Sequence, residues 1–235
     1  MRLFRVPESG IPHGFSTVDA GNMKDDSCGQ SAFLRALGAP WRRTHLLPSR
    51  DGVPSICMGN ESNMERGDGI IVTERQHALT MLPGDCPVVY IAAIPALVMV
   101  HGSLDALWRG ALQAGLLEMQ RLGFAPSQMQ ALIGPGIRPC CYRFSMNHPQ
   151  IEVLATRGEW SSAMHTQGGE FVSIDLHAYI VSVLARSGIE KIAWSSVCTC
   201  CGRDEQAGGP LFFSHRRSVV EGSQEGRFMA AGWLL

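Results

Sequence analysis

The chain has 235 residues, of which 45% are hydrophobic and 17% charged, a composition typical of a folded globular protein and not of a disordered one. Its 20 Lys and Arg residues against 21 Asp and Glu residues give a formal net charge of -1, which excludes a basic field over the whole surface of the kind that binds nucleic acid. The apolar stretch Val88–Val100 is interrupted by Pro95 and is shorter than the roughly 20 residues that a membrane-spanning helix needs. We therefore expect a protein that binds neither nucleic acid nor membranes.

The first residues, MRLFRVPESG, contain no extended apolar stretch and no cleavage site, so we expect no signal peptide and a cytoplasmic location. In a reducing cytosol the eight cysteines would be free thiols. No Pro-, Gly- or Ser-rich linker and no internal repeat divides the chain, which predicts one domain over residues 1–235. We expect a monomer or a weak oligomer.

Apolar periodicity predicts an irregular mixture of helices and strands along the chain. The clearest helix spans Leu104–Leu122, because its apolar residues recur at the i, i+3, i+4 spacing, with Ser103 as a cap and Gly123 as a stop. A mixture without a regular βαβ alternation predicts an α+β fold with mixed or antiparallel sheets and flanking helices. In chain order the other predicted elements are a helix at Ser31–Leu37, strands at Gly69–Thr73, Val88–Ala92, Ala96–His101 and Ala131–Ile133, a helix at Pro149–Thr156, a strand at Phe171–Ile174, a helix at His177–Ser187, and strands at Lys191–Ser196, Leu211–Phe213 and Arg227–Leu234.

The most informative stretch, residues 84–110, contains two apolar strands joined by a tight connection before Pro95. If the loop is Ala93–Ile94, Cys86 lies directly opposite His101, with Cβ atoms roughly 4.5–5.5 Å apart. A three-residue loop would shift the register by one residue and weaken this pairing. The sequence thus predicts a thiol and an imidazole brought together by a hairpin.

Two chemistries fit this pair: a metal ion held by Cys86, His101 and a third ligand, or a Cys86 nucleophile with His101 as its base. The start of the helix after Ser103 would lower a thiol pKa and attract an anion such as phosphate. The alternative is that the pair has only a structural role, with Cys86 buried and His101 hydrogen-bonded to the backbone at the end of its strand. His45, in the loop-like stretch PWRRTHLLPSRDG, is the candidate third ligand, and His77 competes with it.

Arginines near two other motifs are candidates for binding phosphate, because the guanidinium fork suits phosphate oxygens. Arg216 and Arg217 lie in FFSHRR, and Arg138 follows a Gly-Pro-Gly turn in IGPGIRPCCYRF. A solvated turn is the alternative for both segments. No GxGxxG fingerprint, Walker loop or GxSxG elbow is present, so nucleotide cofactors of those classes are not indicated.

A cysteine-rich segment, CTCCGRDEQ at 198–206, looks like part of a metal site. It lacks the paired CxxC…CxxC spacing of a structural zinc site. Buried or chemically inactive thiols are therefore the favoured interpretation of Cys198, Cys200 and Cys201.

Taken in order, nine segments resemble the laccase-domain family, whose members are described as multicopper polyphenol oxidases, as purine nucleoside phosphorylases with adenosine deaminase activity, and as peptidoglycan-editing factors. The resemblance spans nearly the whole chain. It implies a single α+β domain, layered α/β/β/α, with a zinc or copper site made of His, Cys and His. The segments are HGFST (13–17), DGIIVT (68–73), GDCPVV (84–89), VHG…WRG (100–110), IGPGIRPCCY (133–142), IDL (174–176), VCTC (197–200), FFSHRR (212–217) and GR (226–227).

Residue by residue, the resemblance places the family's cysteine ligand on Cys86 and one histidine ligand on His101. The family's first histidine falls most nearly on His45, without its flanking Gln and Gly. The family's Trp-Arg-Gly follows the second histidine closely, whereas here GSLDAL separates His101 from Trp108-Arg109-Gly110. The resemblance thus implies a divergent member with a metal site at His45, Cys86 and His101.

The leading interpretation is a metal-dependent purine nucleoside phosphorylase that acts on adenosine or inosine with phosphate, and that also deaminates adenosine if its zinc activates water. Cys86, His101, Arg216 and Arg217 would be its catalytic residues. The alternatives are a copper-dependent polyphenol oxidase, a Cys-His hydrolase acting on peptidoglycan precursors, and a non-enzymatic remnant. One His-Cys-His set supplies a single copper, whereas reducing oxygen to water takes four electrons.

Overall fold

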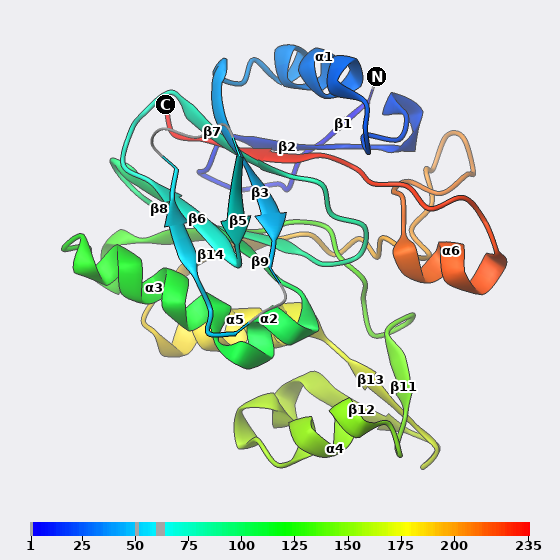
Figure 1. Cartoon of the computed structure of the whole chain (residues 1–235). Coiled ribbons are helices and arrows are strands. Elements are labelled where there is room, and N and C mark those ends of the chain that lie inside the picture. The colour runs from blue at the N-terminus through cyan, green and yellow to red at the C-terminus, as the bar shows by residue number, and fades with distance from the viewer. Residues whose placement is uncertain (1, 50–51, 60–63) are drawn as a thin grey trace.

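The computed structural model of the protein describes residues 2–49, 52–59 and 64–235, which form two six-stranded sheets and a smaller third sheet (Figure 1). The first sheet, in spatial order, consists of β1 (Leu3–Phe4), β2 (His13–Ser16), β15 (Ala230–Gly232), β7 (His77–Met81), β3 (Arg42–Pro48) and β5 (Met64–Gly67). The second consists of β14 (Lys191–Trp194), β10 (Gln130–Ile133), β8 (Val88–Ala93), β9 (Ala96–His101), β6 (Gly69–Val72) and β4 (Ile56–Met58). The third consists of β11 (Arg143–Ser145), β13 (Phe171–Ile174) and β12 (Met164–Gln167).

Helices α1, α2, α3 and α5 lie on the outer sides of the two large sheets. In Figure 1, α1 covers the first sheet at the top, and α2, α3 and α5 lie on the far side of the second sheet. α4 accompanies the third sheet, and α6 stands apart near the C-terminal segment. The helices are α1 (Ser27–Leu37), α2 (Leu104–Arg109), α3 (Ala111–Arg121), α4 (Pro149–Ala155), α5 (Leu176–Arg186) and α6 (His215–Glu221), with short 3-10 turns at Val18–Ala20, Pro126–Gln128 and Gly158–Ala163.

Alternating side chains of β8 explain how the layers hold together. Tyr90 and its same-face neighbours join the core between the two sheets, whereas Ile91 and its neighbours join the core under α2, α3 and α5. A strand that is buried on both faces has a continuous apolar sequence, as this one does. A third cluster packs Phe33 and Leu37 of α1 against the outer face of the first sheet. The predicted α+β fold with mixed and antiparallel sheets, layered α/β/β/α, is therefore confirmed.

The predicted long helix is two helices in the structure. Ser103 does cap the start, because its hydroxyl accepts the backbone N–H of Ala106 at 3.1 Å. The helix breaks at Gly110, whose φ of 94° lies in the left-handed region that favours glycine, and a new helix begins at Ala111. The apolar stripe continues across the break, which is why the periodicity alone did not reveal it.

The central hairpin has a different register from the one expected. β8 pairs antiparallel with β9 so that Ala93 lies opposite Ala96 and Val88 opposite His101. The two-residue loop is thus Ile94–Pro95, and Cys86 lies two residues beyond the partner of His101. Cys86 thus lies in the bend that precedes β8, outside the paired residues of the hairpin.

Three other expectations about local structure were wrong. The stretch around His45 is strand β3, not a loop, and it pairs in parallel with β5 and β7. The predicted strand Leu211–Phe213 is irregular and leads into α6, and the predicted strand Arg227–Leu234 shortens to Ala230–Gly232. Within the described residues, no helix has the length and apolar character needed to cross a membrane.

Candidate functional site

A pocket of about 600 Å³ opens where the end of β3, the segment 81–86, the start of α2 and the first turn of α6 meet. Its volume falls within the range of small-molecule sites, roughly 300–1,000 Å³. The lining residues are Pro48, Ser49, Met81, Leu82, Pro83, Gly84, Asp85, Cys86, His101, Ser103, Leu104, Asp105, Ile137, Tyr142, Phe144, Gln150, Leu176, His215, Arg216 and Arg227.

Cys86 and His101 both line this pocket, as the hairpin pattern predicts. The backbone N–H of His101 donates to the carbonyl of Asp68 at 2.8 Å, which fixes the end of β9. The backbone N–H of Gly102 then donates to the carbonyl of Pro87 at 2.8 Å, which ties that end to the residue after Cys86. The structure therefore places the thiol and the imidazole at one site, and their chemical roles stay predictions.

Asp85, beside Cys86, connects the pocket to two distant segments. One carboxylate oxygen accepts the Thr199 hydroxyl at 2.7 Å, and the other accepts the backbone N–H of Arg216 at 2.6 Å. The hydroxyl of Ser214 accepts the backbone N–H of Arg217 at 3.1 Å. The first turn of α6 is thus held by both side chains, and it brings Arg216 to the pocket wall.

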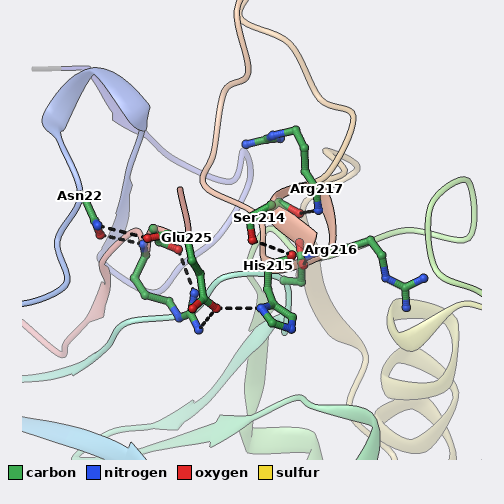
Figure 2. Close-up of polar contacts among 10 residues, drawn as sticks. Asn22, Ser214, His215, Arg216, Arg217 and Glu225 are labelled. Atoms are coloured by element: carbon green, nitrogen blue, oxygen red, sulfur yellow. Dashed lines mark hydrogen bonds and ion pairs between the residues drawn. The ribbon is translucent and has the colours of Figure 1, made fainter. Parts of the chain in front are cut away.

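Arg216 and Arg217 point to different sides of α6 (Figure 2). Arg216 lines the pocket, where its guanidinium carbon lies 5.4 Å from the ring centroid of Tyr142 and 5.6 Å from that of Phe144. Arg217 donates to the carbonyls of Thr199 at 3.1 Å and Cys200 at 2.7 Å, and also to the Phe212 carbonyl. Arg217 is not among the lining residues, and its contacts hold α6 against the cysteine-rich segment.

His215 and Glu225 form a pair at the pocket that the sequence did not single out (Figure 2). The His215 Nδ1 atom lies 2.7 Å from Glu225 Oε1, and Arg227 Nη2 donates to the same oxygen at 2.6 Å. The contacts of Arg227 and His215 hold the pKa of Glu225 below its ordinary value. The histidine of FFSHRR was the available signal, but no helix was predicted after the strand Leu211–Phe213, so the approach of His215 to Glu225 was missed.

The structure does not bring His45 to the pocket. Its Nδ1 atom lies 3.1 Å from the Thr80 hydroxyl on the neighbouring strand β7, and it is not a lining residue. Burial and the positive charge of Arg43 lower the pKa of His45 to about 4. His77, the competing candidate, is buried on β7 with its Nε2 atom 2.9 Å from the Thr44 hydroxyl, and it does not line the pocket either.

Two further sequence candidates have structural partners outside the pocket. Arg138 donates to the Asp175 carboxylate at 3.3 Å and is not a lining residue. Arg109, of the Trp-Arg-Gly element, ends α2 and pairs with the fully buried Asp68 at 2.6 Å and with Asp105 at 3.0 Å. Trp108 lies under the Arg157 guanidinium at 4.7 Å. This element therefore joins α2 to the sheet.

The family resemblance implies a metal site at His45, Cys86 and His101. Among residues 2–49, 52–59 and 64–235, one group of three or more His, Cys, Asp or Glu side chains has ligand atoms close enough to share a metal ion. That group consists of Cys140, Cys141, Cys198 and Cys201, and it contains none of the expected ligands. The role of His45, Cys86 and His101 as ligands of one metal ion therefore stays a prediction, with His45 outside the pocket that the other two line.

Comparisons with known proteins identify relatives of this chain. It is 32% identical over 162 residues to the purine nucleoside phosphorylase YlmD of Geobacillus stearothermophilus, a match that covers 64% of this chain and 54% of that protein. It is 28% identical over 163 residues to a purine nucleoside phosphorylase of Streptomyces coelicolor, covering 68% of this chain and 63% of that protein. The chain thus matches less than two thirds of the length of these relatives.

The fold also occurs in solved structures. The hypothetical protein YfiH of Bacillus licheniformis superposes with a TM-score of 0.78 over 96% of this chain and 93% of that one, at 20% sequence identity. A family model described as multi-copper polyphenol oxidoreductase laccase matches residues 28–235. Because this match covers most of the chain, the protein belongs to the multi-copper polyphenol oxidoreductase laccase family.

Proposed function

We propose that this protein is a purine nucleoside phosphorylase that transfers the ribosyl group of adenosine or inosine to phosphate. Relatives named purine nucleoside phosphorylase support this class of reaction. The observation that carries the proposal is the position of Arg216, a cation on the wall of a nucleoside-sized pocket beside two aromatic rings. One of its N–H groups contacts the Arg143 carbonyl at 3.3 Å, and a guanidinium has five such donors.

In this proposal Arg216 binds the phosphate, because a guanidinium fork makes two charge-assisted hydrogen bonds to phosphate oxygens. Arg227 lines the same pocket and adds positive charge, although Glu225 neutralises part of it. A phosphate oxygen attacks C1′ of the ribose as the bond from C1′ to purine N9 breaks. The products are ribose-1-phosphate and the free base.

The departing purine takes the electron pair of the broken bond and must be neutralised. His215 is suited to deliver that proton, because Glu225 holds its Nδ1 atom and leaves Nε2 for exchange. Cys86 and His101 supply a thiol and an imidazole for hydrogen bonds to the nucleoside, and the rings of Tyr142 and Phe144 supply faces for the base. These roles use the residues of the chain alone.

A substrate panel tests the proposal. Adenosine, inosine and guanosine are each incubated with the protein, with and without phosphate, and the products are separated by chromatography. We expect free base from adenosine or inosine in the presence of phosphate. Base release that is independent of phosphate would indicate hydrolysis, formation of inosine from adenosine would indicate deamination, and three intact nucleosides would contradict the proposal.

A Cys-His hydrolase is the second candidate function. It is favoured by the placement of Cys86 and His101 in one pocket. A thiol nucleophile with a neighbouring base suits amide substrates such as peptidoglycan precursors. Replacing Cys86 with Ala would abolish such an activity, whereas phosphorolysis would keep a phosphate-dependent remainder.

A further inference from the structure

Four cysteines from two separate loops meet in a compact cluster outside the pocket lining. The sulfur atoms of Cys140, Cys141, Cys198 and Cys201 all lie within 4.8 Å of one another, and those of Cys140 and Cys201 are 3.5 Å apart. A tetrahedral zinc ion with bonds of about 2.3 Å to sulfur separates its sulfur ligands by about 3.8 Å. The cluster therefore has close to the dimensions of a four-thiolate site.

The backbone around Cys198 has the form of a metal-binding turn. Cys198 and Cys201 form a CxxC pair, and the backbone N–H of Gly202 closes the turn on the Cys198 carbonyl at 2.8 Å. A Cβ atom at position 202 would collide with that carbonyl, so the turn requires glycine. The expectation that this segment lacks zinc spacing was incomplete, because it did not recognise that the second pair comes from Cys140 and Cys141.

Backbone donors already point at the most buried sulfur. The N–H of Arg138 donates to Cys198 Sγ at 3.4 Å, and the N–H groups of Cys200 and Cys201 also donate to it. Hydrogen bonds of this kind stabilise a thiolate and orient it toward a metal. They are a second observation, independent of the sulfur distances, that indicates a ligand at this place.

The two loops are also joined by backbone contacts. Gly136 forms a parallel β-bridge with Cys198, and the N–H of Thr199 donates to the Gly136 carbonyl at 3.1 Å. Arg217 adds a positive charge against the same turn through the carbonyls of Thr199 and Cys200. The ligands are thus held near their binding positions before any ion arrives, which lowers the entropic cost of binding.

We propose that Cys140, Cys141, Cys198 and Cys201 bind one structural zinc ion. All-thiolate tetrahedral sites select zinc or iron-sulfur centres, and four sulfurs at these separations match a single ion. On binding, four thiols lose four protons and form four Zn–S bonds, with no change in oxidation state. The site is separate from the pocket, because none of the four cysteines lines it.

The ion would fix one wall of the pocket from behind. Tyr142, the residue after Cys141, lines the pocket. Thr199, the residue after Cys198, donates its hydroxyl to Asp85 beside Cys86. Zinc at this position therefore joins two loops that each touch the candidate site.

Elemental analysis of the full-length protein, purified with reductant and without chelator, tests the proposal. We expect about one zinc per chain in the wild type, as a four-ligand structural site implies. Cys140→Ser and Cys201→Ser should each lose the zinc, because each removes one thiolate ligand. Both variants should still fold, because both residues are exposed and the substitutions are small. Cys28→Ser, at another exposed cysteine, and Cys86→Ser, at the pocket, are the matched controls and should keep it.

Cobalt(II) titration of the chelator-treated wild type gives a readout that does not depend on the variants folding. We expect the visible bands of tetrahedral cobalt and an intense thiolate-to-cobalt charge-transfer band in the wild type. Zinc that survives in Cys140→Ser and Cys201→Ser, zinc lost in Cys86→Ser, or a protein free of zinc with a Cys140–Cys201 disulfide would each overturn the proposal. None of these readouts involves nucleoside turnover, so the outcome is independent of the proposed function.

Discussion

The carboxylate of Asp85 accepts the backbone N–H of Arg216 at 2.6 Å, across 131 residues of sequence. This hydrogen bond attaches the first turn of α6 to the residue beside Cys86. It is the contact that puts an arginine and a thiol on the wall of one pocket. The sequence shows both residues in notable motifs but not their connection, because the contact is made by a backbone group.

Replacing Asp85 with Asn should therefore displace α6. The amide keeps one acceptor oxygen but presents an NH2 group where the other contact is made, and hydrogen bonds to charged groups contribute about 1.5–3 kcal/mol each. We expect a loss of about 1–3 kcal/mol in the free energy of unfolding, together with a raised KM for phosphate. Urea unfolding and steady-state kinetics measure the two effects. Glu205→Gln, at an exposed acid, is the control, and equal behaviour of the two variants would refute the coupling.

Replacing Arg216 and replacing Arg217 should have different effects, the first on phosphate binding and the second on stability. Arg216→Ala should raise the KM for phosphate roughly ten- to a hundredfold, since a charge-assisted contact contributes about 1.5–3 kcal/mol, and should leave stability almost unchanged. Arg216→Lys should restore part of the affinity because it keeps the charge.

Arg217→Ala should mainly reduce stability, by about 1–3 kcal/mol, because it removes the donors to three backbone carbonyls. Phosphate KM and the urea midpoint are measured for each variant. The opposite pattern, with phosphate affinity lost in Arg217→Ala alone, would assign the anion to the other side of α6.

The buried ion pair between Arg109 and Asp68 should be important for stability. Asp68 is fully buried, accepts the Arg109 guanidinium at 2.6 Å, and also accepts the backbone N–H of Ser55 at 3.1 Å. Removing one partner of a buried pair leaves an uncompensated charge, so Arg109→Ala should cost about 3–5 kcal/mol in urea unfolding.

A matched control lies on the adjacent helix α3. Arg121 pairs with Glu118 through a side chain that is 63% exposed, so Arg121→Ala should cost less than about 1 kcal/mol. A similar cost for both variants would show that the Arg109 pair is open to solvent in solution.

Much of the fold was predictable where the signal is local. The strands Ala96–His101 and Phe171–Ile174 have the predicted bounds, and the helix at Pro149–Thr156 was placed within one residue. These segments carry their own apolar periodicity. Strand β3 was missed because Arg42 and Arg43 open it with polar side chains, and its pairing with β5 and β7 is not visible in its own sequence.

The candidate site, like the fold, was predictable where the signal is local and not where it depends on distant segments. Cys86 and His101 were placed together because one hairpin holds both, although the Ile94–Pro95 loop moved the register by two residues. The four-cysteine cluster was not predicted, because Cys140 and Cys198 lie on loops whose approach depends on the bridge at Gly136. Long-range packing determines such contacts.

Acidification should destabilise the protein through His177. Burial, together with the charge of Arg138, lowers the pKa of this histidine from 6.5 to about 4, and its Nε2 atom lies 3.0 Å from the Gly134 carbonyl. The unfolded chain binds the proton more tightly, so this histidine's contribution to stability is fully present above pH 6.5 and is lost as the pH falls toward 4.

His177 alone should make the free energy of unfolding fall by up to about 1.4 kcal/mol for each pH unit of acidification within that window. His177→Gln, which keeps an N–H donor, should reduce the slope by up to one proton in urea unfolding measured from pH 7.5 to 5. An unchanged slope in that variant would show that His177 is not a source of the pH dependence.

The central claim, phosphorolysis in the pocket at Arg216, is tested most directly by phosphorus NMR of a reaction containing the protein, inosine or adenosine, and inorganic phosphate. We expect that the ribose-1-phosphate signal grows in step with free base, that Arg216→Ala slows it at low phosphate, and that the exposed-site variant Arg121→Ala does not. Base released without ribose-1-phosphate, or equal rates in both variants, would contradict it.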